Sequence, residues 1–197
     1  MLQVCRTLGL NDLHDFIVIG MDTGFRRGEL LGLHLQDYIN GKLTLHAGET
    51  KSGKARSVPC SARVKAILDA KEKACEAKVF PTLTYSVLRK QWDSMRFHLK
   101  RTDDPKWIIH VLRHTCATRL VVEGVPLPEV KEWMGHKHIQ TTMRYAHLAN
   151  GLSGALERLN ARAARVPQRR RDGPSTGPQW ALPGIPDNGA LPRWRNR

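Results

Sequence analysis

The residue types best suited to chemistry gather between His110 and Tyr145. His110 and Arg113 stand at positions i and i+3, so on a helix both side chains share one face. His136 follows Gly135, a residue that commonly ends a helix, and Tyr145 stands nine residues after His136. Such side chains could together hold a phosphodiester and attack it, because guanidinium groups match phosphate oxygens and a phenol supplies a nucleophile.

These side chains can meet only if the chain turns near Gly135. A continuous helix rotates by about 100° per residue, which would place His136 and Tyr145 on opposite sides. Residues 139–148 are predicted to form a further helix, and its apolar side chains share one stripe: Ile139, Met143 and Ala146. Tyr145 lies more than about 90° from that stripe. We therefore expect its ring to be partly exposed on a mobile helix, outside the core.

A second candidate pair lies in an earlier segment. A first helix is predicted from Asn11 or Asp12 to Met21, with Gly24 after its end and a second helix beginning near Arg26. Arg26 and Glu29 stand at i and i+3, so they can pair. Two interpretations remain open: an exposed ion pair worth only about 0–1 kcal/mol, or a carboxylate that aims a guanidinium at a phosphate.

A small antiparallel sheet is predicted after these helices. Asn40-Gly41 between alternating apolar residues favours a type I′ hairpin over 37–45, and residues 56–59 form a third strand. The intervening turn carries Lys51 and Lys54 at its tip. Lysines at a hairpin tip are usually solvated, but a flexible ammonium can also reach a neighbouring groove and deliver a proton.

The remaining elements are predicted as helices. Two of these helices, 61–78 and 85–100, are interpreted as scaffold. Four further helices are predicted at 110–122, 128–134, 139–148 and 151–165. The predicted fold class is therefore α+β, mainly helical with a small antiparallel sheet. Residues 1–165 are predicted as one domain. Residues 166–197 are rich in proline, glycine and arginine, which predicts a disordered basic tail.

Composition restricts the class of protein. The 197 residues carry a formal net charge of +14, with a pI near 10.2, which suggests a polyanionic partner such as nucleic acid. The sequence contains no run of 18 apolar residues, so no membrane span is predicted, and residues 1–10 do not resemble a signal peptide. The four cysteines form no C-x-x-C pair, so we expect free thiols and a cytoplasmic location.

The sequence resembles the tyrosine recombinase (phage integrase) family, specifically its C-terminal catalytic domain. Five stretches carry the resemblance over about residues 10–160, in the order that the family shows: residues 23–30 (TGFRRGEL), 50–54 (TKSGK), 110–115 (HVLRHT), 134–136 (MGH) and 144–147 (RYAH). Each stretch is weak by itself, but five in order make chance unlikely. The resemblance implies a DNA breaking and rejoining fold and site-specific recombination.

The resemblance also implies a role for each matched residue. Arg26 and Arg113 would clamp the scissile phosphate, and Tyr145 would attack phosphorus to leave a 3′-phosphotyrosyl link and a free 5′-hydroxyl. Lys51 would act as the general acid that protonates the leaving oxygen, and His110 would assist proton transfer. His136 would donate a hydrogen bond to the phosphate, and the carboxylate of Glu29 would orient the site. Lys54 remains the alternative to Lys51.

The chemistry of the transition state favours the same residue types. Extra negative charge spreads over the phosphate oxygens, and two guanidiniums can bind it without a metal or a cofactor. His110 and His114, at i and i+4, could hold zinc, but no third ligand is evident and the sequence lacks the glutamate of a zinc protease. We therefore expect no metal and no cofactor. His114 is predicted to be structural, packing or bonding within its own helix.

The resemblance implies double-stranded DNA and further copies of this chain as partners, with a tetramer on paired sites and the segment 151–165 packing on a neighbouring copy. Family members usually carry an N-terminal domain that clamps DNA, and here the chain is expected to lack it. The alternative function is therefore a catalytically inactive DNA-binding remnant. A third possibility is DNA relaxation through a nick, as in type IB topoisomerases, which share this chemistry.

Overall fold

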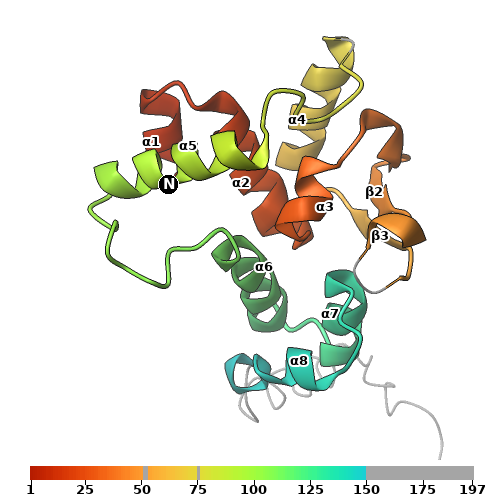
Figure 1. Ribbon diagram of the computed structural model, residues 1–197. Helices are drawn as coiled ribbons and strands as arrows, with labels where there is room; N and C mark the ends of the chain where they lie inside the picture. The colour runs from red at the N-terminus through yellow and green to blue at the C-terminus, as the bar shows by residue number, and fades with distance from the viewer. Residues whose placement is uncertain (51–52, 75, 150–197) are drawn as a thin grey trace, which may run out of the picture. The chain divides into compact units, whose positions relative to one another are not determined.

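The predicted fold class is confirmed by a computed structural model, which describes residues 1–50, 53–74 and 76–149 (Figure 1). Helices dominate this part of the chain, and three short strands form its sheet. The helices are α1 Leu2–Thr7, α2 Asn11–Thr23, α3 Arg27–Leu31, α4 Ala62–Lys73, α5 Tyr85–His98, α6 Val111–Val122, α7 Leu127–Met134 and α8 Gln140–Met143. The strands are β1 Tyr38–Ile39, β2 Lys42–Leu45 and β3 Arg56–Pro59, and single 3₁₀ turns cover Leu35–Asp37, Ala47–Glu49 and Ala146–Leu148.

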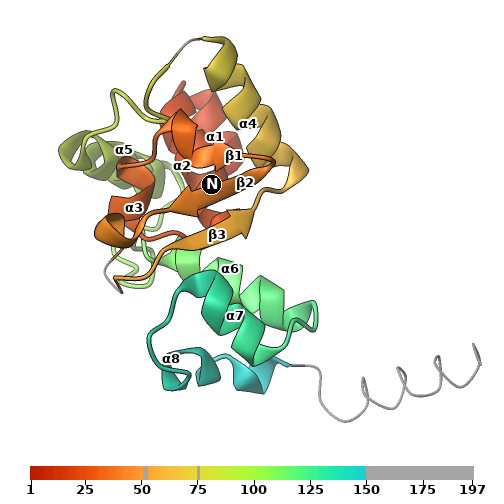
Figure 2. The same cartoon turned by 90° about the vertical axis from the view of Figure 1, so that its right-hand side faces the viewer.

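The three strands form an antiparallel sheet in the order β1-β2-β3. Asn40 and Gly41 both adopt positive φ angles, 51° and 74°, as the predicted type I′ hairpin requires. Leu43 pairs with Val58 across β2 and β3, and both side chains are buried. Figure 2 shows the sheet with β3 on the side nearest α7. The hairpin predicted from Asn-Gly is thus confirmed, and it fixes the register of β1 against β2.

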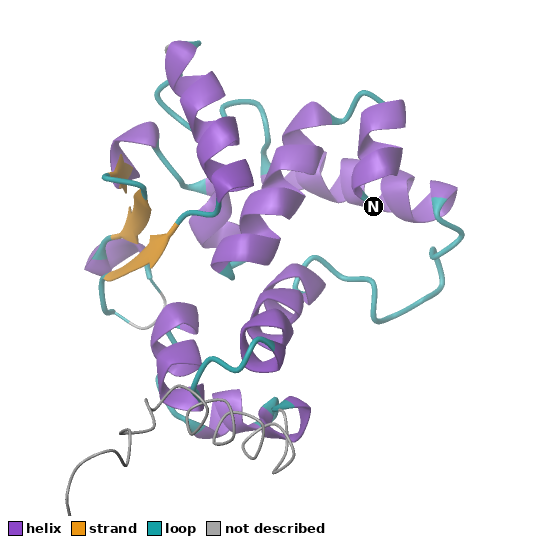
Figure 3. Ribbon diagram, turned by 180° about the vertical axis from the view of Figure 1, so that it is seen from behind, coloured by secondary structure: helices purple, strands orange, loops and turns teal. Residues whose placement is uncertain are grey.

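In the described residues, the hydrophobic core has two clusters that α6 connects. The larger cluster surrounds α2, whose residues from Phe16 to Ile19 are all buried, and it includes Leu112 of α6. The smaller cluster joins α6, α7 and the segment after α8 through a set of six buried residues: Cys116, Ala117, Val121, Val130, Met134 and Tyr145. Figure 3 shows α6 between these two groups of helices. One helix therefore contributes to both clusters and carries residues 111–115 of the HVLRHT stretch, with His110 directly before its first turn.

The helix predicted over 61–78 is shorter than expected and ends at Lys73. The reason is a competing backbone pairing. The N–H of Leu35 donates to the carbonyl of Ala77, and the N–H of Val79 donates to the carbonyl of Leu33. Residues 77–79 therefore extend beside residues 33–35 instead of continuing the helix.

The prediction of one helix over residues 139–148 is wrong. Helix α8 ends at Met143, and the N–H of Tyr145 donates to the carbonyl of Thr142, three residues earlier, at 3.0 Å. The helical phase is therefore lost before Tyr145. As a result Met143 is 55% exposed, whereas Tyr145 is only 7% exposed and belongs to the smaller core cluster. The expectation of an exposed ring was wrong for this reason.

Three predictions from the sequence concern residues that lie wholly or partly outside the described ranges. The helix at 151–165 and the tail from 166 lie outside the described residues. Cys5, Cys60 and Cys116 are free thiols, as expected, and Cys75 lies outside the described ranges. Within these ranges, no helix is long and apolar enough to cross a bilayer.

Candidate active site

Arg26 is positioned by the end of α2. Gly24 adopts φ of +68° and ends that helix, so the chain reverses and Arg26 immediately precedes α3. Its N–H donates to Oε2 of Glu29 at 2.7 Å, and its guanidinium Nη1 donates to Oε1 at 2.9 Å. The pairing of Arg26 with Glu29 is thus confirmed. The interpretation as an exposed surface pair is wrong, because the Glu29 side chain is 3% exposed.

Glu29 also binds a second arginine, Arg56 at the start of β3. Nη2 of Arg56 donates to Oε2 of Glu29 at 2.6 Å, and Nη1 donates to Oε1 at 3.3 Å. Burial alone would raise the pKa of Glu29, but the hydrogen bonds and charges of Arg56 and Arg26 outweigh burial and hold that pKa below its ordinary value. The site is therefore built on one carboxylate held between two guanidiniums.

Sequence reasoning missed Arg56, although one signal was available. The contact joins residues 27 positions apart, so no helical spacing reveals it. Alternate residues of a strand share one face, however, and Val58 is buried on β3. Arg56 lies on the same face two residues earlier, with its side chain 8% exposed. An arginine on the same strand face as a buried valine needs a charged partner. The sequence could therefore have predicted that Arg56 is buried in an ion pair.

Arg113, on α6, forms hydrogen bonds to the C-terminal ends of two other helices. Its Nη1 donates to the carbonyl of Gly24, which ends α2, at 2.5 Å, and its Nη2 donates to the carbonyl of Met134, which ends α7. Helix C-termini carry partial negative charge, so both positions suit a cation. Burial, and then the charges of Arg26 and Arg56, lower the pKa of Arg113 to about 10. The guanidinium is thus still protonated at neutral pH.

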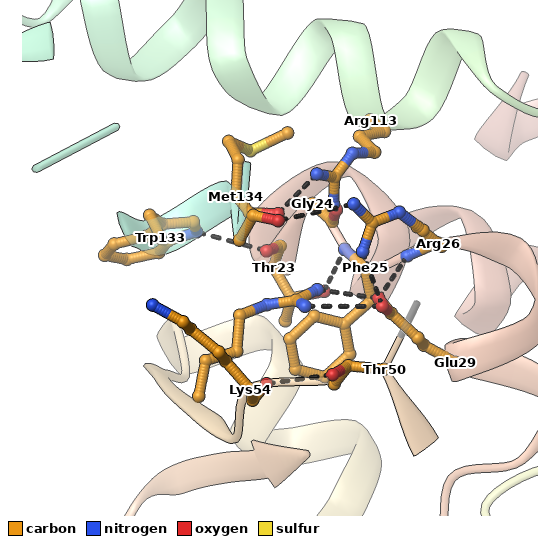
Figure 4. Close-up of polar contacts among 12 residues, drawn as sticks. Thr23, Gly24, Phe25, Arg26, Glu29, Thr50, Lys54, Arg113, Trp133 and Met134 are labelled. Carbon is orange, nitrogen blue, oxygen red and sulfur yellow. Dashed lines mark hydrogen bonds and ion pairs between the residues drawn. The ribbon is translucent and has the colours of Figure 1, made fainter. Parts of the chain in front are cut away.

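The turn that follows α7 brings Arg26 to the same place. Nη2 of Arg26 donates to the carbonyl of Gly135 at 3.3 Å, one residue beyond the carbonyl that Arg113 binds. Figure 4 shows the two guanidiniums side by side at this turn, with Glu29 on the far side of Arg26. Gly135 has φ of +63°, and a Cβ there would lie 2.7 Å from Nη1 of Arg56. A glycine is therefore required where the three arginines converge.

His136 follows this turn directly and is oriented by α8. Its Nδ1 lies 2.9 Å from the hydroxyl of Thr142, a residue with no exposed surface. Burial, and then the charges of Arg113 and Arg26, lower the pKa of His136 to about 4. The ring is therefore neutral at neutral pH and keeps one N–H that it can donate.

Tyr145 makes a hydrogen bond that the sequence analysis did not expect. Its Oη lies 2.5 Å from Nδ1 of His114 on α6. Burial raises the pKa of Tyr145, although the charges of Arg144 and Arg113 oppose that rise. His114 was predicted to pack or bond within its own helix. It does pack against His110, one turn earlier, but it also contacts the phenol of Tyr145, 31 residues away.

His110 stands at the beginning of α6, one turn before His114. The two imidazoles meet edge to face, with their centroids 4.8 Å apart. Partial loss of solvent, and then the charges of His114 and Arg113, lower the pKa of His110. His110 thus contacts the ring of His114, which in turn contacts Tyr145.

The structure leaves the choice of lysine open. Lys51 lies outside the described residues. Lys54 is exposed, and its carbonyl accepts a hydrogen bond from the hydroxyl of Thr50 at 2.9 Å (Figure 4). In the ranges that the structure covers, no three His, Cys, Asp or Glu side chains group in a way that could hold a metal.

Two pockets flank the converging arginines. One, of about 600 Å³, is lined by Arg26, His110 and Arg113 together with the aromatic rings of Trp92 and Trp107. The other, of about 840 Å³, has a different set of cationic and aromatic lining residues that includes Lys54, Arg56, Lys131, Trp133, His136 and Lys137. The site is thus open on both sides, with basic side chains along each opening, which suits an extended anion.

Comparisons with known proteins agree with this geometry. The model of the phage integrase family matches residues 1–151. The tyrosine recombinase XerD of Lacticaseibacillus casei is 32% identical over 161 residues, which cover 74% of this chain and 53% of that protein. The chain spans 36% to 53% of the length of four curated relatives that it matches.

Solved structures give the same result. The catalytic domain of bacteriophage HP1 integrase matches with a TM-score of 0.58 and 27% identity, over 74% of this chain and 81% of that chain. The XerH site-specific recombinase, bound to a palindromic difH substrate in a post-cleavage complex, matches with a TM-score of 0.57 and 26% identity. That match covers 78% of this chain and 45% of XerH.

Proposed function

This chain belongs to the phage integrase family, and we propose that it catalyses site-specific recombination of double-stranded DNA. In this proposal a strand is cut by attack of Tyr145 on a phosphodiester, and the 3′-phosphotyrosyl link is later resealed by another 5′-hydroxyl. The bond energy is kept in the link, so the reaction needs no ATP. The net charge of +14 suits a duplex DNA partner.

The observation that carries the proposal is the convergence at the Met134–Gly135 turn. Arg113 and Arg26 donate to two successive carbonyls there, and His136 is the next residue. Two guanidiniums and a neutral imidazole N–H supply donors around one point, which is the arrangement that stabilises a pentacoordinate phosphate. Three segments far apart in the sequence supply these groups.

The remaining roles are proposed from the resemblance of the matched residues to the family. Glu29 orients Arg26 by accepting from both its N–H and its guanidinium. Lys51 protonates the 5′-oxygen as it leaves, with Lys54 as the alternative. His110 assists proton transfer beside Arg113. No metal or cofactor is needed in this mechanism, because the guanidiniums neutralise the developing charge.

We also propose that the active assembly contains several copies of this chain, with four copies on two paired DNA sites. The motivation is that a single Tyr145 cuts one strand, whereas exchange between two duplexes needs four cuts. Light scattering with and without DNA tests this proposal. Assembly on DNA supports it, and a strict monomer under both conditions contradicts it.

Covalent trapping tests the function. The full chain is incubated with nicked duplexes whose short fragment diffuses away after cleavage, and the products are separated on a denaturing gel. We expect a protein–DNA band with the unmodified chain and with the control Tyr38→Phe, and no band with Tyr145→Phe. A band that survives Tyr145→Phe contradicts the proposed nucleophile. DNA binding without any band, with the unmodified chain, supports a DNA-binding remnant instead.

A further inference from the structure

The contact between His114 and Tyr145 involves the reacting atom itself. His114 extends from α6 into the smaller core cluster, where its Nδ1 lies 2.5 Å from Oη of Tyr145. The neighbouring Arg113 has its guanidinium on the carbonyls that end α2 and α7. Consecutive residues of one helix thus serve the two halves of the site: Arg113 lies at the turn proposed to bind phosphate, and His114 holds the phenol.

The phenol needs a proton acceptor. Tyr145 is 7% exposed, and its burial disfavours a free phenolate. An attacking oxygen must nevertheless lose its proton as the bond to phosphorus forms. Among the described residues, His114 is the one that forms a hydrogen bond with this hydroxyl.

The surroundings of His114 keep its ring neutral and ready to accept. Burial, and then the charges of Arg144 and Arg113, lower the pKa of His114. His110 meets the same ring edge to face, and among the described residues Tyr145 is the other ionisable side chain in direct contact with it. A neutral imidazole with its proton on Nε2 presents a lone pair at Nδ1, toward Oη.

We propose that His114 is the catalytic base that removes the proton of Tyr145 during strand cleavage. This inference rests on the proposed function. The Oη–H bond breaks, the proton passes to Nδ1 of His114, and the phenol oxygen forms the bond to phosphorus. The bond from phosphorus to the 5′-oxygen breaks, and that oxygen takes a separate proton from the general acid, for which Lys51 is proposed. In resealing, His114 returns its proton to the departing phenol oxygen.

This assignment separates the two histidines of the HVLRHT stretch. The resemblance to recombinases implies proton transfer by His110, whereas the direct contact with the nucleophile belongs to His114. The imidazolium that forms on His114 lies near Arg113 and Arg144, so it is unfavourable alone. The negative charge that accumulates on the phosphate in the same step offsets this repulsion.

The test compares His114→Asn with His98→Asn, the same change at an exposed histidine of α5. Asparagine can keep a hydrogen bond to Oη but cannot take a proton. We expect covalent capture by His114→Asn to slow by about 10²-fold or more. The rate of His114→Asn should keep rising with pH toward the pKa of the Tyr145 phenol, which burial raises above its ordinary value, whereas the rate of the unmodified chain levels off at lower pH. An unchanged rate and pH profile overturn the inference.

A second substrate separates the base from the general acid. A 5′-bridging phosphorothiolate has a sulfur leaving group that needs no proton, so it should rescue Lys51→Ala and leave His114→Asn slow. Rescue of His114→Asn to the unmodified rate overturns the inference. Loss of capture in Tyr145→Phe is checked in the same series, so a failure of the proposed nucleophile is recognised separately.

A measurement on the unmodified chain does not depend on how the variants fold. Nitrogen NMR of ¹⁵N-histidine-labelled protein reports which ring nitrogen carries the proton. We expect the Nε2–H tautomer for His114 at neutral pH. The Nδ1–H tautomer overturns the inference, because His114 would then donate to Tyr145 and could not accept from it.

Discussion

The hydroxyl of Thr142 lies 2.9 Å from Nδ1 of His136, and the carbonyl of the same threonine accepts the N–H of Tyr145 at 3.0 Å. One residue with no exposed surface thus connects the proposed phosphate donor to the segment that carries Tyr145, the proposed nucleophile. We expect a buried threonine whose hydroxyl and carbonyl are both engaged in this way to act as a positioning residue.

Replacing Thr142 should therefore impair catalysis more than DNA binding. Thr142→Val keeps the shape of the side chain but leaves Nδ1 of His136 without its partner. By analogy with groups that orient metal ligands, we expect a loss of about 10- to 100-fold in the rate of covalent capture. The measurement is capture at saturating DNA. Thr142→Ser restores the hydroxyl and should recover most of the rate, and equal losses in both variants would point to packing instead.

Removing Arg56 should destabilise the fold, because Glu29 would keep a buried charge with one partner fewer. Both side chains are less than a tenth exposed, so Arg56→Met should cost about 3–5 kcal/mol of unfolding free energy, measured by denaturant titration. Arg63 is the matched control, since its pair with Asp22 has an arginine that is 44% exposed. Arg63→Ala should cost at most about 1 kcal/mol. Similar costs for the two variants would contradict the role given to Glu29.

Stability should rise with pH between about 4 and 6.5 because of His136. Its folded pKa, about 4, lies below the unfolded value of 6.5, so in this window the unfolded chain binds more protons than the folded chain. The difference of about 2.5 between the two pKa values corresponds to about 3 kcal/mol of unfolding free energy, which is present above pH 6.5 and is lost as the pH falls through the window. His110 and His114 are shifted in the same direction. His136→Gln should therefore reduce the slope without abolishing it, and an unchanged slope would contradict the low pKa.

Alanine at Gly135 should be worse than alanine at another glycine of positive φ. Gly135 and Gly9 have φ of +63° and +66°, but only at Gly135 would a Cβ meet Arg56, at 2.7 Å. Gly9→Ala should cost about 1–2 kcal/mol from backbone strain. Gly135→Ala should exceed that cost and also slow covalent capture, because it displaces the guanidinium that holds Glu29. Equal costs would show that strain alone accounts for the change.

Local spacing predicted the parts of the site that are local. Gly24 ended a helix as expected, Arg26 paired with Glu29, and the Asn40-Gly41 hairpin formed. The contacts that span the fold were not predictable in this way. Arg56 reaches Glu29 through the packing of β3, and His114 reaches Tyr145 because the segment leaves the helix at Met143. Periodicity assumes an unbroken helix, so it placed the tyrosine on the wrong side.

Arg26 and Arg56 bind the carboxylate of Glu29, and the charge of Arg113 lies close to theirs, so anion binding contributes to the stability of the molecule. Three positive charges and one negative charge lie close together, and the pKa of Arg113 is lowered in part by the other two arginines. The folded chain thus holds like charges near one another in poorly solvated surroundings. Any phosphate that enters relieves this repulsion, so ligand binding and resistance to unfolding are thermodynamically linked. Under the proposed function, the chain without DNA should therefore be less stable toward unfolding than the chain with DNA bound.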